Sequence, residues 1–249
     1  MSRAQPLPTH ALSPDEPIDG GLIRLALGHV DAAVGALAPG ATADAVHEAR
    51  KSTKRARAVL ALVGGDRVPA GRVRDAARAL APLRDADVLR ALADRHRLEA
   101  PPPVEAPIRA AAAAAALDHL AEARRSLPTA RLSSSVEELW ASVARSWRRA
   151  RRAERQEADL HELRKASKRV LHQLEVVAEL RPGTRPLAAA LEALQEDLGD
   201  HHDLVLLSGL TAAPELHLDR SERRLRAQAR VALAASSSAL LRWLRVDAR

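Results

Sequence analysis

Two segments of this sequence place histidine, arginine and lysine at the spacing of a single helix face. The first reads His47-Glu48-Ala49-Arg50-Lys51-Ser52-Thr53-Lys54-Arg55, and the second reads His161-Glu162-Leu163-Arg164-Lys165-Ala166-Ser167-Lys168-Arg169. They align without gaps on the pattern H-E-x-R-K-x-[ST]-K-R. Side chains at positions i, i+3, i+4 and i+7 fall on one side of an α-helix. Each segment therefore predicts a helix with a cationic face.

The residue types on these faces suit a string of phosphates. Arginine offers a planar fork of donors that matches phosphate oxygens, lysine adds a mobile point charge, and protonated histidine donates from both ring nitrogens. Like charges at i, i+4 repel each other, so a bound polyanion would remove a cost that the empty face carries. A charge run on a helix is usually a solvated face. Its repetition in two copies is what favours a ligand.

The opposite side of each predicted helix is apolar and is expected to enter the core. In the first copy, Arg55 and Arg57 flank the cationic face, and in the second copy His172 extends it by a turn. The expected core residues are Val46, Ala49, Ala56, Leu60 and Val63 in the first copy and Leu160, Leu163, Val170, Leu174 and Val177 in the second.

The elements that must carry these faces all read as helices. Breakers at Pro39-Gly40, Gly64-Gly65 and Arg181-Pro182-Gly183 separate helical periodicities, and no stretch alternates like a strand. The fold class predicted is all-α, with two tandem repeats resembling four-helix bundles and a basic groove or pore between them. The predicted divisions are a flexible Pro-rich leader (1–17), a first helical repeat (18–127), a linker (128–135) and a second helical repeat (136–249). Within the second repeat, separate helices are expected at 185–198, 202–209 and 214–246.

Composition narrows the functional classes. The 249 residues carry a net charge of +7, which favours an acidic partner, and the absence of cysteine excludes disulfides, thiol catalysis and cysteine-ligated metals. There is no Phe or Tyr, so a core of Leu, Ala and Val is expected. No secretory segment follows Met1, and the longest apolar run, Ala110 to Leu117, is too short to span a bilayer. We expect a cytoplasmic protein with no membrane partner.

A second motif pair follows the first. Leu80-Ala81-Pro82-Leu83-Arg84-Asp85 corresponds to Leu198-Gly199-Asp200-His201-His202-Asp203. Together, the two motif pairs resemble the signature of the CHAD family, the conserved histidine α-helical domain, over nearly the whole chain. The resemblance implies two helical bundles about a basic groove or pore, and binding of inorganic polyphosphate. We expect the protein at polyphosphate granules within the cytoplasm. It implies no catalysis and no cofactor.

Carried over by position, the implied polyphosphate ligands come from both copies. They are His47, Arg50, Lys51, Lys54, Arg55, Arg57, His161, Arg164, Lys165, Lys168 and Arg169, to which His172 is added. The chain departs from the family in two places. Ala81 stands where the family has glycine, and Leu171-His172 stands where an arginine and an aromatic residue are usual, so Arg57 has no charged counterpart.

Two other functions compete with this one. His201-His202-Asp203 resembles the metal-binding His-Asp pair of phosphohydrolases. The first copy has Leu83-Arg84-Asp85 and lacks both histidines, so no metal site is predicted. Asp85 and Asp203 are expected to cap a helix or to brace the basic motif. Nucleic acid would also be attracted to the basic faces, but single-strand recognition uses aromatic side chains for base stacking, and the chain has no Phe or Tyr. A last expectation concerns His47 and His161, whose cationic surroundings should oppose protonation until an anion binds.

Overall fold

The structure is a computed structural model that describes residues 11–62, 64–65, 67–130, 132–133, 135–156, 159–211 and 222–233. Its helices are α1 (Ile18–Leu37), α2 (Ala43–Leu60), α3 (Val68–Ala79), α4 (Ala81–His96), α5 (Ala106–Ser126), α6 (Val136–Arg155), α7 (Leu160–Val177) and α8 (Arg185–Thr211). A further helix covers residues 222–233. Short 3-10 turns lie at Leu127–Thr129 and Pro182–Thr184. The predicted all-α class is confirmed.

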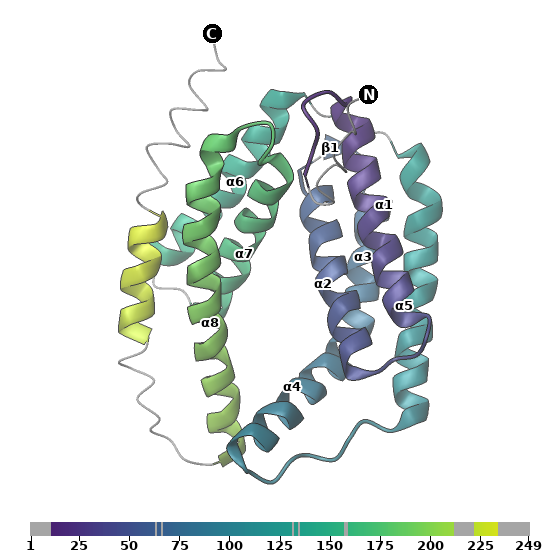
Figure 1. Cartoon of the computed structure of the whole chain (residues 1–249), viewed down its shortest axis with the longest axis vertical. Coiled ribbons are helices and arrows are strands. Elements are labelled where there is room, and N and C mark those ends of the chain that lie inside the picture. Colours follow the sequence, from purple (N-terminus) through teal and green to yellow (C-terminus); the bar gives the residue numbers. More distant parts are fainter. Residues whose placement is uncertain are drawn as a thin grey trace, which may run out of the picture.

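The helices form two groups that stand beside each other (Figure 1). One group contains α1, α2, α3 and α5, and the other contains α6, α7 and α8. The helix over 222–233 joins the second group, since Arg230 donates to Glu154 of α6 at 3.2 Å. Helices α2 and α7, which carry the repeated motif, contact each other across the boundary between the groups.

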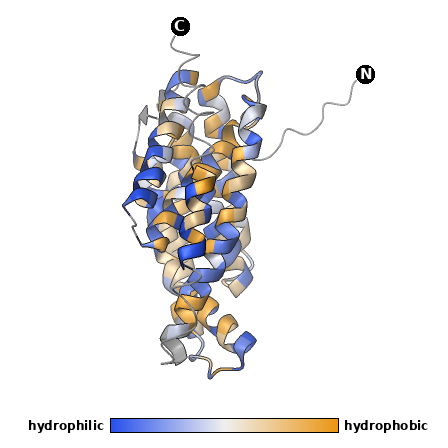
Figure 2. Ribbon diagram, turned by 90° about the vertical axis from the view of Figure 1, so that its left-hand side faces the viewer, coloured by the Kyte–Doolittle hydropathy of each residue, from blue (hydrophilic) through white to orange (hydrophobic). Residues whose placement is uncertain are grey.

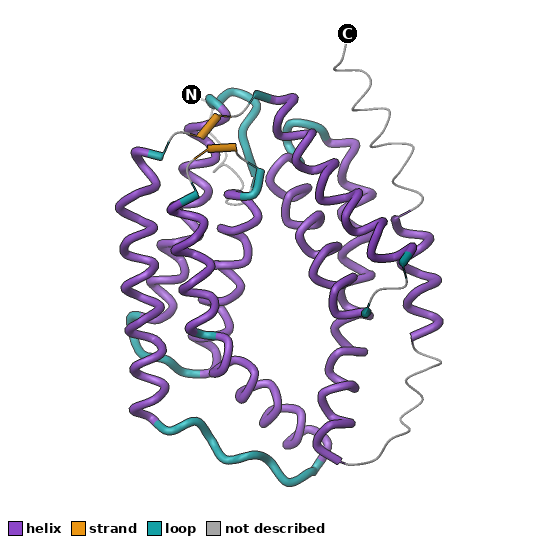
Figure 3. The backbone as a smooth tube through the Cα atoms, turned by 180° about the vertical axis from the view of Figure 1, so that it is seen from behind, coloured by secondary structure: helices purple, strands orange, loops and turns teal. Residues whose placement is uncertain are grey.

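Helix α4 belongs to neither group. It contacts α2 and α3 at one end and α8 at the other, so it crosses from the first group to the far end of the second (Figure 3). The only strands in the described chain are β1 (Gly64–Gly65) and β2 (Leu132–Ser133), which pair antiparallel and add a second link between distant segments.

One expectation about the second half needs correction, and another is tested only in part. The segments 185–198 and 202–209 are one continuous helix, α8, which passes through Gly199. Glycine weakens a helix by only about 1 kcal/mol relative to alanine, and packing against α7 is enough to keep the helix intact. The helix expected at 214–246 is present over 222–233, and its remaining residues lie outside those described.

Caps fix where the motif helices begin. The Thr42 hydroxyl accepts a hydrogen bond from the amide of Ala45 at 3.2 Å and starts α2. The Asp159 carboxylate accepts from the amide of His161 at 3.0 Å and starts α7. Because unpaired amides at a helix start need such acceptors, the capped starts place both motif histidines in the first turns of their helices.

The core is aliphatic, as the composition predicted. Leu163, Val170 and Leu174 are fully buried on α7, and Val46 and Ala49 are fully buried on α2. The other expected core residues of the two helices are buried as well, apart from Val63, which lies outside the described residues. Seen from the side, the molecule is narrow, and polar and apolar residues alternate along the helices (Figure 2). The motif helices thus anchor one face and leave the cationic face free.

The leader expected over 1–17 ends earlier than predicted. Residues 1–10 lie outside the described part of the chain, but Leu12 is 1% exposed, and its amide donates to the carbonyl of Val176 on α7 at 2.7 Å. Arg24 of α1 binds Glu16 at 2.5 Å. These contacts of Leu12 and Glu16 hold the segment in place, and the bond from Leu12 attaches the start of the described chain to the second group.

Helix α1 is the one described helix that is long and apolar enough to cross a membrane, judged by length and composition alone. The core helix of a globular protein meets the same criteria. Leu22, Leu25 and Val30 are at most 2% exposed, and α1 packs against α2 and α5. Its apolar residues are thus accounted for by the core.

Removing core contacts behind the second motif should destabilise the fold. Leu163 is fully buried on the side of α7 opposite the cations. We expect Leu163→Ala to lower the free energy of unfolding by about 2–5 kcal/mol, the usual cost of such a cavity. Chemical denaturation monitored by far-UV circular dichroism measures this loss. A change below about 1 kcal/mol would contradict the packing described.

Candidate polyanion-binding site

All twelve residues predicted as ligands line one cavity. Its volume is about 1900 Å³, and its walls come from α2, α3, α4, α6, α7 and α8. The lining includes His47, Arg50, Lys51, Lys54, Arg55, Arg57, His161, Arg164, Lys165, Lys168, Arg169 and His172. The two motif copies, more than a hundred residues apart in sequence, therefore face a shared space.

The cavity holds the excess charge of the chain. Fourteen Lys and Arg side chains line it against seven Asp and Glu side chains, an excess of seven positive charges. The whole chain has 39 basic and 32 acidic residues, also an excess of seven. The remainder of the sequence is therefore balanced, and the positive potential is concentrated where a ligand could enter.

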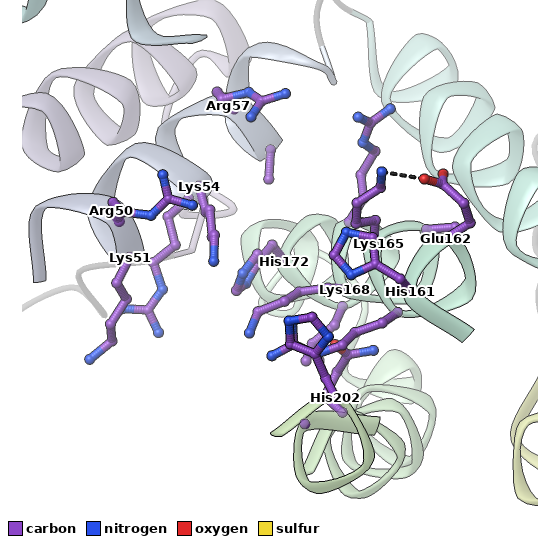
Figure 4. Close-up of a pocket in the computed structure, with 18 of the residues that line it drawn as sticks. Arg50, Lys51, Lys54, Arg57, His161, Glu162, Lys165, Lys168, His172 and His202 are labelled. Carbon is purple, nitrogen blue, oxygen red and sulfur yellow. Dashed lines mark hydrogen bonds and ion pairs between the residues drawn. The ribbon is translucent and has the colours of Figure 1, made fainter. Parts of the chain in front are cut away.

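Lys54 of α2 and Lys168 of α7 project into this space from opposite walls (Figure 4). Burial by the cavity walls lowers the pKa of Lys54 to about 8, with further lowering by the charges of Lys168, Arg50, Arg164 and Arg84. Burial also lowers the pKa of Lys168, which Glu175 partly opposes. Both ammonium groups therefore lie in a field that an anion would relieve.

The other two motif lysines are placed differently. Lys51 pairs with Glu48 at 3.3 Å, and Lys165 pairs with Glu162, in each case across one helical turn. These side chains are about half exposed. Exposed pairs of this kind contribute little to stability, so both lysines remain available to an anion at the mouth of the cavity.

Arg50 and Arg164 lie close enough to the aspartates of the second motif to feel their charge. Arg50 donates to the carbonyl of Ala77, in the last turn of α3, at 2.7 Å. The carboxylate of Asp85 lies near Arg50 and that of Asp203 lies near Arg164, and each favours the charged form of its arginine. Burial nevertheless lowers the pKa of both arginines. An aspartate of the second motif therefore favours the charge of a first-motif arginine in both halves, without an ion pair between them.

The expectation that Asp85 and Asp203 might cap helices is wrong, whereas the bracing role agrees with the structure. Asp85 lies inside α4 and Asp203 lies inside α8, where the first unpaired amides of a helix are out of reach. The space around the glycine of the second motif does not require a glycine. A Cβ on Gly199 would lie 3.9 Å from Nη2 of Arg164, an ordinary contact. Ala81 in the first copy is therefore no obstacle.

The Ser/Thr position of the motif is structural. The hydroxyl of Ser167 donates to the carbonyl of Leu163 at 2.7 Å and accepts from Nε2 of Gln195 on α8 at 2.7 Å. The hydroxyl of Thr53 donates to the carbonyl of Arg50 at 2.9 Å. Both side chains are buried. This position therefore anchors each motif helix and does not meet the cavity.

His47 and His161 lie near the starts of the motif helices. Burial, followed by the charge of Arg84, lowers the pKa of His47, so the predicted direction holds there with burial as the main cause. The rings of His161 and His202 lie 5.2 Å apart between centroids, and burial followed by the Arg164 charge lowers the pKa of His202. Nδ1 of His172 lies 3.0 Å from Glu175, so only its other ring nitrogen is free to meet a ligand.

Several lining cations were missed from the sequence. They are Arg67, Arg74, Arg84, Arg149 and Arg152, together with His202. Arg149 and Arg152 belong to a run of six arginines between 145 and 155 on α6, and that run was a signal that could have been followed. Arg67 and Arg74 belong to neither repeated motif. They reach the cavity because α3 packs beside α2.

The residues around His201, His202 and Asp203 were considered as a metal site. Among the described residues, no group of three or more His, Cys, Asp and Glu side chains is arranged to hold a metal ion. His201 is buried with 9% of its surface exposed, and it lines a smaller pocket together with His202, which also lines the large cavity.

Comparisons with known proteins agree with this fold. The sequence model of the CHAD domain matches residues 21–144 and 129–212. No curated protein sequence is significantly similar to the chain. The crystal structure of the CHAD domain from the plant Ricinus communis aligns with a TM-score of 0.60 and 22% sequence identity, covering 94% of this chain and 96% of that one. This chain, with its two cationic motif helices on one cavity, belongs to the CHAD domain family.

Proposed function

We propose that this chain binds inorganic polyphosphate in the cavity between α2 and α7, without catalysing a reaction. The observation that carries the proposal is the excess of seven positive charges on the lining, equal to the excess of the entire chain. A linear polyanion neutralises such a surface and releases its own counterions as it binds. We further propose a cytoplasmic location, at polyphosphate granules where these form.

The size of the site favours a chain of phosphates over one small phosphate compound. Typical small-molecule pockets measure about 300–1,000 Å³ and are mostly apolar, whereas this cavity is about 1900 Å³. Its cations come from several helices and are spread along the walls, as the labelled side chains of Figure 4 illustrate. A ligand that repeats one anionic group at short intervals can satisfy many of them together.

Nucleic acid is the alternative that needs a direct test. The lining contains no Phe, Tyr or Trp, so bases would find no aromatic side chain to stack on. Labelled polyphosphate should bind and should be displaced by unlabelled polyphosphate at far lower phosphate concentration than by single-stranded RNA or DNA. Equal displacement by nucleic acid, at two salt concentrations, would contradict the proposed ligand.

Binding should take up protons near neutral pH. In the empty cavity the pKa values of His47 and His202 are lowered, and nearby phosphates should raise them. A group whose pKa is higher in the complex favours binding in its protonated form, so affinity should rise as pH falls from 7.5 toward 6, by at most about tenfold per pH unit for each proton taken up.

Titration calorimetry in buffers of different ionisation enthalpy measures this uptake. His47→Ala should reduce the number of protons bound at pH 6.5, while His119→Ala, on the outer helix α5, should leave it unchanged. Zero uptake at pH 6.5 in the unaltered protein would reject this role for the histidines.

A further inference from the structure

The use of lysine in this chain is selective. There are 35 arginines and four lysines, and the lysines are Lys51, Lys54, Lys165 and Lys168. All four lie in the two motif copies, at matching positions. Everywhere else the chain uses arginine as its cation. Arginine stays charged under all ordinary conditions, whereas a lysine can lose its proton and react as an amine. The motif positions thus hold the only side-chain amines in the protein.

The four amines differ in their surroundings. Lys51 and Lys165 are tied to Glu48 and Glu162 by ion pairs. For Lys54, by contrast, the charged neighbours that act on it are all cations: Arg50 on its own helix, Lys168 and Arg164 on α7, and Arg84 on α4. In the described part of the chain no carboxylate lies within ion-pair distance of Lys54.

Lys54 is also reachable. The cavity walls surround its side chain, which nevertheless keeps exposed surface toward the cavity, and the cavity is large enough to admit a small anion. The same cations that disfavour its ammonium form attract anions to it. With a pKa of about 8, about half of Lys54 carries a neutral amine at pH 8, whereas an ordinary lysine is neutral in fewer than about 1% of molecules. The neutral amine of Lys54 is therefore a nucleophile at a position where the surrounding cations attract anions.

We propose that Lys54 is a site of acylation by acyl phosphates. The neutral Nζ attacks the acyl carbon, an N–C bond forms as the bond from that carbon to the phosphate oxygen breaks, and inorganic phosphate leaves with the bonding electrons. The nitrogen then gives one proton to solvent, which leaves a neutral amide. The charges of Arg50, Arg164 and Arg84 attract the phosphate of the donor toward the amine. No enzyme and no further reagent are required.

Acylation of Lys54 would regulate polyphosphate binding, and this part of the inference rests on that proposed function. It removes one positive charge from the centre of the lining and replaces the ammonium donors with a bulkier amide. The loss of one charge-assisted contact should weaken polyphosphate binding by about tenfold to a hundredfold. Bound polyphosphate should in turn protect Lys54, because it raises the proton affinity of the amine and fills the cavity.

The first measurement needs no polyphosphate. The intact protein is treated with acetyl phosphate at pH 8, and acetylation of each lysine is followed by peptide mass mapping. Lys54 should react roughly tenfold faster than Lys51 and Lys165, since about a hundredfold gain in free amine is partly offset by the lower nucleophilicity of a less basic group, as it is for thiols. Equal rates at all four lysines, or faster reaction at Lys51, would overturn the proposal.

The second measurement separates this inference from the proposed function. Polyphosphate affinity of the treated protein should fall in proportion to Lys54 acetylation, and acetyl phosphate should change the affinity of K54R by less than about twofold, because arginine is not acylated under these conditions. An equal loss in treated K54R would refute the regulatory role. Selective acetylation in a protein that never bound polyphosphate would support the modification site and refute the proposed function.

Discussion

Reversing the charge of Lys54 and Lys168 together should abolish polyphosphate binding while leaving the helices folded. Both side chains project into the cavity from opposite walls (Figure 4), and both lie among other cations. Each lost charge-assisted contact costs about 1.5–3 kcal/mol, so K54E/K168E should weaken binding by roughly a hundredfold to ten-thousandfold before any repulsion is counted.

The control for this variant keeps the change in net charge and moves it elsewhere. Arg95 and Arg125 are exposed and do not line the cavity. R95E/R125E should bind polyphosphate within a few fold of the unaltered protein. Affinity is measured by competition against labelled polyphosphate, and far-UV circular dichroism checks helicity. Unchanged affinity in K54E/K168E, or an equal loss in both variants, would refute the proposed site.

Salt should weaken binding steeply. If the seven excess charges of the lining each neutralise one phosphate, the slope of log Kobs against log salt should be about −5, using the value of about −0.7 per contact for flexible single strands. Affinity would then fall roughly a thousandfold between 50 and 200 mM salt. Titrations at four or more salt concentrations give this slope directly.

Single substitutions sharpen the salt experiment. K54Q should reduce the magnitude of the slope by about 0.7, the value for one phosphate contact. R125Q, outside the cavity, should leave the slope unchanged. A slope near zero in the unaltered protein would mean that binding does not release counterions, and the electrostatic mechanism would then be wrong.

Local pattern was enough to predict the helices and the faces of the motifs. Val170 and Leu174 are buried and Lys168 faces the cavity because helical geometry alone decides which side a residue occupies. For the same reason, one period of 3.6 residues predicted that His47 and Lys54 would share a face. The all-α class followed from the absence of strand alternation.

Long-range packing was beyond the sequence. The crossing of α4 to α8, and the burial of Leu12 against α7, depend on contacts between segments far apart in the chain. The break expected near Gly199 was wrong because tertiary packing outweighs the weak local preference of one glycine. Arg74 reaches the cavity because α3 lies beside α2, and no sequence motif predicts that packing.

The balance of charge outside the cavity affects how copies of this protein meet in solution. While the cavity is empty, each molecule has a net charge of +7 and repels its neighbours. Once about seven phosphate charges are seated, the net charge approaches zero, and proteins near zero net charge tend to associate and precipitate. Molecules with a neutralised cavity would then cluster. A longer polyphosphate would add negative charge beyond neutralisation, and the repulsion between the complexes would separate them again.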